Sequence, residues 1–348
     1  MTTEVNAIVF DAINKVSVQS FPFLTCGATE IVCETLYTFV SPGTELRVLG
    51  GHYSKAEDFP LIPGYSSVGR VVEVGASVRG YQLGDLVSCR NPNPLEGVNA
   101  MWGGQAGRQV HATAGEQRPV LLPAGCDALD YVVAEVASIS LRGVVAAQAK
   151  RDETAVVIGQ GMIGAFSAAW LMAEGCRVIV CDVDEARLEQ ARQRGVFAAV
   201  NLRDDNSMER LNTLLHDGAD IVVESSGVSA GVETAFKLVR KKPQAYGEAY
   251  KIEPIQFYGG DWSRLVLQAN YIEPVSINPH GFFPGEGVTI LTPMDRGVEE
   301  RYKCIESIRT GRLKAQDYID LVMPYRDAAE GYRKLQSHEL SSVVFAWQ

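Results

Sequence analysis

The chain has 348 residues, a length that fits about two domains and excludes a peptide or a single small module. Apolar residues make up 46% and charged residues 21%, as in folded soluble proteins. The net charge is −10, which argues against nucleic acid or an anionic membrane as a partner, because either would need a basic face. The seven cysteines are scattered without C-x-x-C spacing, and the opening residues show no secretory signal, so we expect a cytoplasmic protein without a disulfide framework.

Short β-branched runs separated by Gly and Pro dominate residues 1–136 and predict a β barrel or sandwich. Residues 131–150 then show the apolar spacing of a helix. Turns are expected at Pro42-Gly43, Pro63-Gly64, Gly80, Gly84 and Gly103-Gly104. The expected strands are residues 7–10, 31–40, 69–74, 86–89 and 109–112.

Strands and helices alternate from residue 154 onward, which predicts a doubly wound parallel sheet with helices on both faces. Residues 155–173 carry no charge and are long enough to span a membrane, but their glycines and Gln160 favour a strand, a turn and a helix in a soluble domain. The expected strands are residues 155–158, 177–181, 197–200, 221–224 and, last, 288–291. The expected helices are residues 163–174, 184–194, 208–216, 230–240 and 298–310.

Residues 241–287 do not follow this alternation and are rich in aromatic side chains. Two interpretations stay open for them. They form either a locally packed excursion or dimer contact, or a wall of a substrate cleft.

A G-x-G-x-x-G run at residues 159–164 follows an expected strand and opens an expected helix. Gly159 permits a tight turn, Gly161 lets the backbone approach a pyrophosphate, and Gly164 allows the helix and the strand to pack closely. The helix N-terminus at Met162 and Ile163 offers N–H groups to the anion. The motif predicts dinucleotide binding, the alternative being a structural glycine turn.

Asp182 lies at the end of the second expected strand of this region, where a carboxylate can accept hydrogen bonds from the adenosine ribose hydroxyls. A carboxylate there would repel a 2′-phosphate, so we expect NAD rather than NADP. Two alternatives stay open. Asp182 caps the following helix, although Asp184 is better placed for that, or Arg187 recruits a phosphate.

Four segments resemble the medium-chain dehydrogenase/reductase superfamily, whose members are alcohol dehydrogenase-like. Residues 41–47 (SPGTELR) are similar to its C-G-T-D-x-H loop, and residues 60–69 (PLIPGYSSVG) to its P-x-x-x-G-H-E-x-x-G segment. Residues 81–87 (YQLGDLV) are similar to its x-x-x-G-D-x-V strand. Residues 218–227 (GADIVVESSG) are similar to its G-A-D-x-V-x-x-x-x-G segment.

The resemblance implies a GroES-like β-rich catalytic domain and a Rossmann nucleotide-binding domain. The first would comprise residues 1–136 and 297–348, and the second residues 137–296. It also implies a small-molecule substrate, NAD as the cofactor with Ser226 near it, and a homodimer.

Both zinc sites of the family are expected to be lost. Pro42 stands at the position of a zinc-binding Cys, while Tyr65 and Ser66 replace a His and a Glu, and all three are poor zinc ligands. Residues 134–143, where a third ligand usually lies, contain no Cys or His, and only Cys89 lies near the structural zinc lobe. We therefore expect no metal ligands. Among zinc-free relatives the chain looks most similar to the bacteriochlorophyllide dehydrogenase-like group, rather than to the quinone and enoyl reductases.

Without zinc, a side chain has to carry the substrate proton. Thr44 matches the hydroxyl that relays this proton in the family, and Tyr65 would point into the vacated metal position, with Arg47 or Lys55 as a cation that lowers its pKa. His52 is a further candidate. The alternatives are that Thr44 satisfies a turn, that Tyr65 is a half-buried aromatic, and that His52 is an exposed loop residue.

These observations together favour a zinc-independent NAD(H)-dependent oxidoreductase. It would interconvert a secondary alcohol and a ketone on a polyol, cyclitol or ring-bearing metabolite. One alternative is an NAD(P)H-dependent reductase of an activated C=C bond. The other is a non-catalytic dinucleotide-binding regulator.

Overall fold

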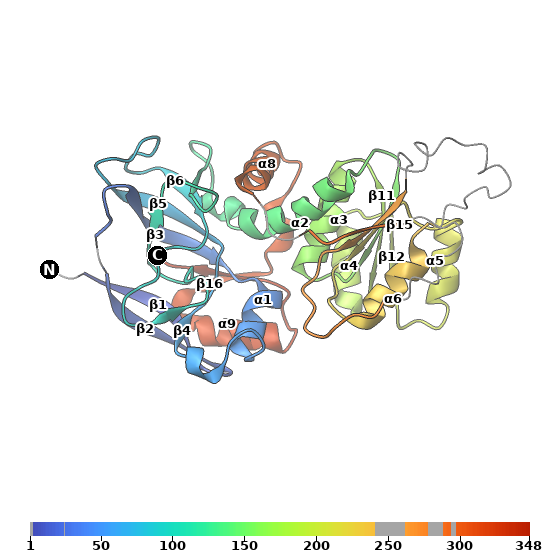
Figure 1. The fold of residues 1–348 in the computed structure, drawn as a ribbon, viewed down its shortest axis with the longest axis horizontal. Coiled ribbons are helices and arrows are strands. Elements are labelled where there is room, and N and C mark those ends of the chain that lie inside the picture. The colour runs from blue at the N-terminus through green and yellow to red at the C-terminus, as the bar shows by residue number, and fades with distance from the viewer. Residues whose placement is uncertain (1–2, 24, 241–261, 278–287, 294–296) are drawn as a thin grey trace. The chain divides into compact units, whose positions relative to one another are not determined.

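The computed structural model describes residues 3–23, 25–240, 262–277, 288–293 and 297–348. The chain divides into two compact units (Figure 1). Unit 1 contains residues 1–138 and 296–348, and unit 2 contains residues 139–295. None of the helices in the described ranges is both long and apolar enough to cross a membrane.

A six-stranded sheet forms the centre of unit 2, with its strands in the order β12-β11-β10-β13-β14-β15 and all neighbours parallel. This is the order of a doubly wound Rossmann sheet, which confirms the predicted α/β fold class; the winding reverses between β10 and β13. The strands are β10 (Thr154–Ile158), β11 (Arg177–Asp182), β12 (Ala198–Asn201), β13 (Ile221–Glu224), β14 (Ser263–Leu267) and β15 (Val288–Leu291). The helices are α3 (Met162–Ala173), α4 (Glu185–Gln193), α5 (Ser207–Leu215) and α6 (Ser229–Leu238).

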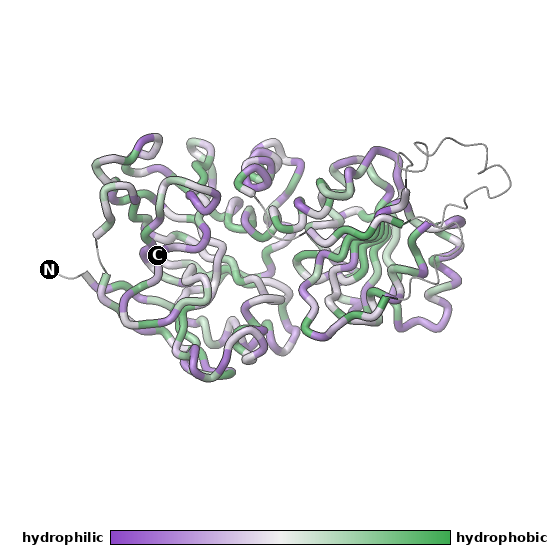
Figure 2. The backbone as a smooth tube through the Cα atoms, viewed as in Figure 1, coloured by the Kyte–Doolittle hydropathy of each residue, from purple (hydrophilic) through white to green (hydrophobic). Residues whose placement is uncertain are grey.

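The central strands of unit 2 are mostly apolar (Figure 2), as expected for a parallel sheet with helices packed on it. Val156 on β10 lies between its register partners Ile179 and Val222, and all three are fully buried. Some of the helices end at a local signal in the sequence. Gly175 and Gly195, for example, follow α3 and α4 with φ of +86° and +88°, a conformation that favours glycine.

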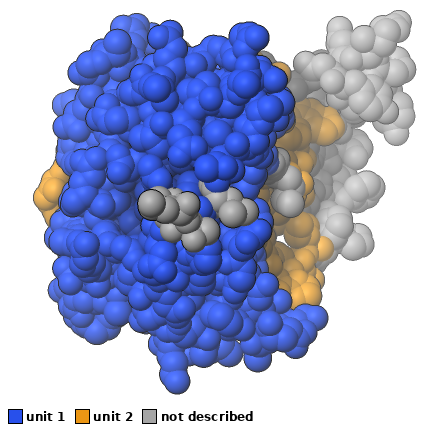
Figure 3. All heavy atoms as spheres, turned by 90° about the vertical axis from the view of Figure 1, so that its left-hand side faces the viewer, with its two compact units in different colours: residues 1–138, 296–348 blue, residues 139–295 orange. Residues whose placement is uncertain are grey.

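Unit 1, blue in Figure 3, is built from two β-sheets. One has the order β2-β1-β4-β7, and the other has the order β16-β17-β3-β5-β6-β9 with β8 paired to β3. Their strands are β1 (Thr3–Ala12), β2 (Lys15–Phe23), β3 (Glu30–Phe39), β4 (Leu61–Ile62), β5 (Ser67–Val74), β6 (Leu86–Cys89), β7 (Asn99–Ala100), β8 (Arg108–Ala112), β9 (Val120–Leu121), β16 (Leu321–Pro324) and β17 (Val343–Ala346).

Helices cover the sheets of unit 1 and bury a cluster of aromatic rings. Phe10 of β1 meets Tyr332 edge-on with ring centroids 5.0 Å apart, and Phe345 of β17 packs on the same ring. The α-helices are α1 (Pro42–Leu49), α8 (Val298–Arg309) and α9 (Ala328–Gln336), while α2 (Ala134–Ala147) begins in unit 1 and continues into unit 2. The described residues of unit 1 also contain the short 3₁₀ helices η1 (Ala56–Asp58), η2 (Ala128–Tyr131), η5 (Ala315–Tyr318) and η6 (Tyr325–Asp327).

Three sequence predictions about elements were wrong. Pro42 and Gly43 do not form a turn but begin α1, because the fixed φ of proline suits the first helical position. Residues 263–267 do follow the alternation, since they form β14 between β13 and β15; residues 241–261 and 278–287 lie outside the described residues. Residues 288–291 are not the last strand of the chain, because β16 and β17 return to the sheet of unit 1.

Candidate functional site

The glycine loop of unit 2 connects β10 to α3 at the carboxyl end of the sheet, where its winding reverses. Gly159 has a φ of +86°, and a Cβ there would lie 2.7 Å from the backbone nitrogen of Ser226. A Cβ on Gly164 would collide with the carbonyl oxygen of Gly159. A Cβ on Gly161, in contrast, would meet nothing within 4 Å. The loop thus has a turn, a close packing contact and an open backbone position, which is what pyrophosphate binding requires.

The first turn of α3 follows directly, with buried Met162 and half-buried Ile163. The carbonyl oxygen of Ile163 accepts hydrogen bonds of 2.9 Å from the hydroxyls of Ser140 and Ser167. The helix entrance is therefore held in place by side chains of α2 and α3, while its first N–H groups point toward the loop.

Asp182 ends β11 and is 6% exposed. Its Oδ2 accepts a 2.5 Å hydrogen bond from the backbone N–H of Gln160, inside the glycine loop, and its Oδ1 accepts from the N–H groups of Val183 and Asp184 at 2.7 and 2.9 Å. Since each carboxylate oxygen has two lone pairs, Oδ2 retains capacity for a ribose hydroxyl. Asp184, not Asp182, caps α4 by accepting from the N–H of Ala186 at 2.9 Å.

Arg187 lies in the first turn of α4, and its Nε is 3.6 Å from Oδ2 of Asp184. The two side chains are partly exposed, at 27% and 36%. A 2′-phosphate would have to compete with Asp184 for this guanidinium while lying near the carboxylate of Asp182.

Glu224 is fully buried at the end of β13, in register with Ile158 of β10. Its Oε1 accepts from the backbone N–H of Ser226 at 2.8 Å and from the Ser226 hydroxyl, and its Oε2 accepts from the N–H of Gly227 at 3.3 Å and from the phenol of Tyr271. Burial and the bond to Glu224 raise the pKa of Tyr271. Glu224 therefore fixes Ser226 beside Gly159.

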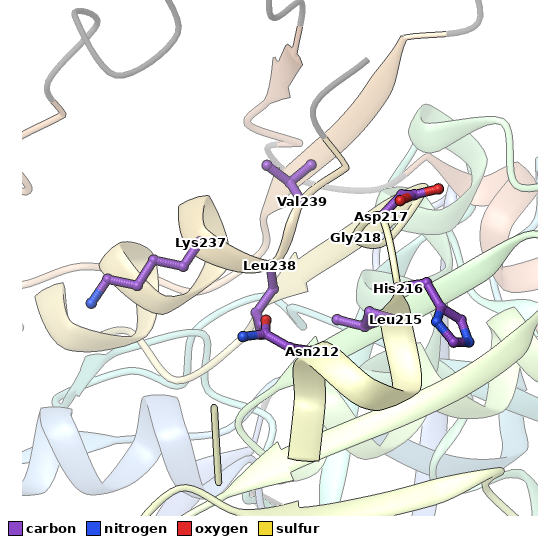
Figure 4. A pocket seen from close by; sticks show the side chains of 8 residues that line it. All are labelled: Asn212, Leu215, His216, Asp217, Gly218, Lys237, Leu238 and Val239. Carbon is purple, nitrogen blue, oxygen red and sulfur yellow. The ribbon is translucent and has the colours of Figure 1, made fainter. Parts of the chain in front are cut away.

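A small surface pocket of about 190 Å³ lies at the end of the unit 2 sheet where strand β13 begins, opposite the carboxyl ends of the strands (Figure 4). Its lining residues come from the end of α5, the loop before β13 and the end of α6, so the pocket faces away from the glycine loop. Ligands of doubly wound sheets bind at the carboxyl ends of the strands, and this pocket is not that site. The lining residues are Asn212, Leu215, His216, Asp217, Gly218, Lys237, Leu238 and Val239.

In unit 1, the phenol of Tyr65 donates a 2.7 Å hydrogen bond to Oγ of Ser41, the residue before α1. Tyr65 is 7% exposed, so it is more deeply buried than the half-buried aromatic we considered. Its ring meets Trp102 edge-on with centroids 5.4 Å apart. The two predicted catalytic loops are thus joined through a pair of hydroxyl groups.

Glu45 lies in the first turn of α1, close to Ser41 in the sequence, and is fully buried. Its Oε1 accepts from the backbone N–H of Ser41 at 2.8 Å, and its Oε2 accepts from Tyr332 at 2.6 Å and from Nε2 of Gln105 at 3.2 Å. Burial raises the pKa of the Glu45 carboxyl to about 7, although these hydrogen bonds act to lower it.

Thr44 is half-buried in the same turn of α1, and its backbone N–H donates to the carbonyl of Ser41 at 3.1 Å. The loop after α1 places His52 in solvent. Among the predicted catalytic residues, the structure therefore brings Thr44 and Tyr65 to Ser41 from two segments and leaves His52 exposed.

The two cations expected beside Tyr65, Arg47 and Lys55, contact other side chains. Nη1 of Arg47 donates to the phenol of Tyr53 at 2.9 Å, and its guanidinium lies over the Tyr53 ring. The side chain of Lys55 is 80% exposed and lies 3.8 Å from Glu57. Lys55 is therefore not the cation that we expected to act on the buried Tyr65.

The comparisons with known proteins agree with this geometry. Residues 28–124 match the family described as alcohol dehydrogenase GroES-like domain, and residues 163–245 match the family described as zinc-binding dehydrogenase. L-threonine 3-dehydrogenase of Vibrio cholerae is 31% identical over 308 residues, covering 83% of each chain. Sorbitol dehydrogenase of Halalkalibacterium halodurans is 26% identical over 249 residues, covering 66% of this chain and 71% of that protein.

Solved structures share the whole fold at low identity. An Escherichia coli alcohol dehydrogenase complexed with NADH has a TM-score of 0.80 at 17% identity, with 99% of each chain covered. A Sinorhizobium meliloti protein of the zinc-binding dehydrogenase class, bound to NADP, has the same TM-score, identity and coverage.

A β-rich GroES-like unit and a Rossmann unit with a glycine loop define an oxidoreductase of the alcohol dehydrogenase type. The chain belongs to the medium-chain dehydrogenase/reductase superfamily.

The zinc that the family name implies does not fit the residues at its usual place. Pro42 has no donor atom and begins α1. The Ser66 hydroxyl donates to the carbonyl of Val132 at 2.8 Å, and the Tyr65 phenol donates to Ser41. Neutral hydroxyls engaged in this way are not the imidazole, thiolate and carboxylate ligands that zinc takes in proteins.

The third segment that would supply a zinc ligand contains one carboxylate, Glu135, and it is held by two arginines. Its Oε1 lies 3.4 Å from Nη1 of Arg90, and its Oε2 lies 3.5 Å from Nε of Arg301. All three side chains are no more than 1% exposed. This buried ion cluster is a structural tie between α2, α8 and the loop after β6, and it is not available to a metal.

Sequence reasoning missed Ser41, Glu45 and Glu224 as site residues. Ser41 and Glu224 carry a local signal, since one precedes the family loop and the other lies two residues before Ser226. The role of Glu45 depends on Tyr332, 287 residues away, and no local pattern indicates that contact.

Proposed function

We propose that the protein is a zinc-independent, NAD(H)-dependent oxidoreductase that interconverts a secondary alcohol and a ketone on a polyol, cyclitol or ring-bearing metabolite. The observation that carries this proposal is the Tyr65–Ser41 hydroxyl pair at the place where relatives hold zinc. The names of the two relatives, a sorbitol dehydrogenase and an L-threonine 3-dehydrogenase, support a hydroxyl-bearing substrate.

Residues 137–296 would form the cofactor domain. Asp182 supports NAD, because its buried carboxylate is held at the ribose end of the glycine loop and would repel a 2′-phosphate. Gly159, Gly161 and Gly164 would receive the pyrophosphate. The bound dinucleotide supplies the hydride acceptor or donor.

Residues 1–136 and 297–348 would form the catalytic domain. The Tyr65 phenol donates to Ser41. If the phenol oxygen takes the proton of a substrate alcohol, its own proton would pass along this hydrogen bond to Ser41, and Ser41 would release its hydroxyl proton to a further acceptor. Thr44, in the first turn of α1, is the second hydroxyl that can hold this proton. Glu45 acts as a positioning residue, because its carboxylate accepts from the backbone N–H of Ser41 and so fixes the Ser41 backbone.

A substrate screen tests the proposal. Purified protein is mixed with NAD or NADP and a panel of polyols, cyclitols and ring-bearing secondary alcohols, and the absorbance of the reduced nicotinamide is followed with and without a chelator. We expect turnover with NAD that the chelator does not abolish. Turnover only of activated C=C bonds with NADPH, or dinucleotide binding without any turnover, would support the reductase or the regulator instead. We also propose that the protein is cytoplasmic and forms a homodimer. Size-exclusion chromatography tests the homodimer.

A further inference from the structure

Three side chains of metal-ligand type meet inside the β-structure of unit 1, at residues to which the proposed function assigns no role. They are Cys33 on β3, Cys89 at the end of β6 and His111 on β8. One ligand atom from each lies within 4.8 Å of the other two, and all three side chains are at most 2% exposed. Within the described ranges this is the one group of three such side chains at ligand distances.

The register of the sheet explains why they meet. β8 pairs with β3 so that Gln109 is opposite Cys33 and His111 is opposite Ile31. β5 lies between β3 and β6, with Ser67 opposite Cys89. The space beside the sulfurs is kept by Gly69, since a Cβ at this position would lie 3.0 Å from Cβ of Cys33. Strands β3, β6 and β8, which are distant in sequence, therefore bring two sulfur atoms and one imidazole nitrogen close together.

The spacing of the two sulfur atoms suits a shared metal ion. The Sγ atoms of Cys33 and Cys89 lie 4.0 Å apart. Two thiolates on one tetrahedral zinc, each about 2.3 Å from the ion, would lie about 3.8 Å from each other. A disulfide needs about 2.0 Å, so its formation would require the strands to move. Two thiolates and an imidazole are also the donor set that zinc and Cu⁺ prefer.

The imidazole of His111 is oriented by a fixed hydrogen-bond chain. Nε2 of Gln109 donates to the carbonyl of Gly104 at 2.7 Å, which assigns its Oε1 as the acceptor. Ser67 donates to this oxygen at 3.0 Å, and Nε2 of His111 lies 3.0 Å from it and must donate too. The neutral ring therefore keeps its lone pair on Nδ1. A second nitrogen donating to an amide oxygen is the usual support of a metal-bound histidine.

The interior around the cluster is apolar, with Ile31, Val71 and Val87 among its neighbours. A bound ion there would need its charge balanced by its ligands. Two thiolates would neutralise Zn²⁺, and one thiolate with one thiol would neutralise Cu⁺.

We propose that Cys33, Cys89 and His111 form a binding site for one thiophilic cation, Zn²⁺ or Cu⁺, which ties β3, β6 and β8 together. These residues are not those that the family resemblance associates with zinc. The site lies in the core rather than beside the Tyr65–Ser41 pair, so its role would be structural. Binding displaces thiol protons to the solution: Zn²⁺ would release two protons and bind two thiolates, and Cu⁺ would release one proton and bind one thiolate and one thiol.

The test measures metal content. The full chain is produced in medium supplemented with Zn²⁺ or, separately, with copper under reducing conditions, dialysed against a weak chelator and assayed by elemental mass spectrometry. We expect about one ion per chain, and the metal that survives dialysis identifies the cation. Cys33→Ala and Cys89→Ala should each lose it. Cys304→Ala, which removes another fully buried cysteine of unit 1, should keep it.

A spectroscopic measurement covers the case in which a cysteine variant fails to fold. Production of the unaltered chain with Co²⁺ should give a thiolate-to-cobalt charge-transfer band, absent from a metal-free sample. The proposal is overturned if the unaltered chain holds less than about a tenth of an ion in both media and shows no such band. It is equally overturned if folded Cys33→Ala and Cys89→Ala retain the full metal content, or if denatured, metal-free protein lacks two titratable thiols because Cys33 and Cys89 have oxidised to a disulfide.

Discussion

Tyr332 donates a 2.6 Å hydrogen bond to the buried carboxyl of Glu45, from α9 to α1, across 287 residues of sequence. Ser41 and Gln105 also donate hydrogen bonds to this carboxyl group, which lies in the core of unit 1. These hydrogen bonds do not fully compensate for the loss of hydration, because burial still raises the pKa of Glu45 from 4.5 to about 7. Glu45 therefore makes the stability of unit 1 depend on pH.

We predict that the free energy of unfolding falls as pH rises from 5 to 8, and that Glu45→Gln removes this part of the slope. The folded state holds the Glu45 proton up to about pH 7, while the unfolded state releases it near 4.5. The stabilisation is thus present at low pH and is lost as pH rises through 7. Its size is about 2–3 kcal/mol, measured by urea unfolding at a series of pH values.

An exposed carboxyl provides the control. Arg309 lowers the pKa of Glu306, so this group stays ionised in both states over the same pH range. Glu306→Gln should leave the slope between pH 5 and 8 unchanged. A slope that persists in Glu45→Gln would mean that Glu45 is not its source.

Removal of the charge of Glu135 should destabilise unit 1 strongly. Glu135→Gln leaves the guanidinium groups of Arg90 and Arg301 in the core without their carboxylate, which typically costs about 3–5 kcal/mol. Hydrogen exchange of peptides from α2 and α8 measures the loss locally. The matched change Glu330→Gln, in an exposed pair with Arg333, should have a much smaller effect, because solvent screens this pair. Similar effects of the two changes would contradict the proposed importance of the buried cluster.

The doubly wound sheet could be predicted because its signals are local. The strands of unit 2 are mostly apolar runs, and α3 and α4 end at glycines. Residues 159–164 and Asp182 are spaced as one strand-turn-helix-strand unit requires. The glycines and the carboxylate therefore lie where the pattern indicates. We did not predict β14 because its five residues lie within the long aromatic-rich sequence 241–287, which shows no clear strand pattern.

The site in unit 1 could be predicted only in part, because its contacts join distant segments. The family loop identified Thr44 and Tyr65, but the bond from Tyr65 to Ser41 depends on how two loops fold together. The Cys33, Cys89 and His111 group has no recognisable spacing along the chain, since it depends on the register of strands β3, β5, β6 and β8. Strand register is not encoded in any short motif.

Cofactor affinity should reveal the role of Asp182. We predict that NADH binds more tightly than NADPH, and that Asp182→Gly weakens NADH by about 10–100-fold, since charge-assisted hydrogen bonds to the ribose are lost, while NADPH changes less. Dissociation constants from fluorescence titration measure both. Asp182 also accepts the N–H of Gln160, so Asp184→Asn, in the neighbouring cap, controls for loop disturbance. Equal affinities of the unaltered chain for the two cofactors would contradict NAD preference.

The proton route gives the most direct test of the chemistry. Tyr65→Phe deletes only the phenol oxygen that donates to Ser41, and Thr44→Val deletes only a hydroxyl in the first turn of α1. If either group carries the substrate proton, kcat should fall by about 10²–10⁴ with cofactor affinity nearly unchanged. Tyr53→Phe, which removes the phenol that accepts from Arg47, is the matched control and should keep kcat within about threefold, because Tyr53 is outside the hydroxyl pair.

The Ser41→Ala variant and the pH dependence of kcat distinguish a role of Tyr65 in proton transfer from a purely structural role of the Tyr65–Ser41 pair. If Tyr65 is the carrier and Ser41 positions it, Ser41→Ala should lower kcat less than Tyr65→Phe and shift the pH at which kcat is half-maximal, since the phenol loses its hydrogen-bond acceptor. A purely structural role for the pair would change stability but leave the pH profile where it is. Milder losses in both Tyr65→Phe and Thr44→Val would favour a reductase of C=C bonds, whose hydride step needs less help at oxygen. Retention of nearly full kcat by both would refute the route through Tyr65 and Thr44, and it would turn attention to exposed His52 or to water.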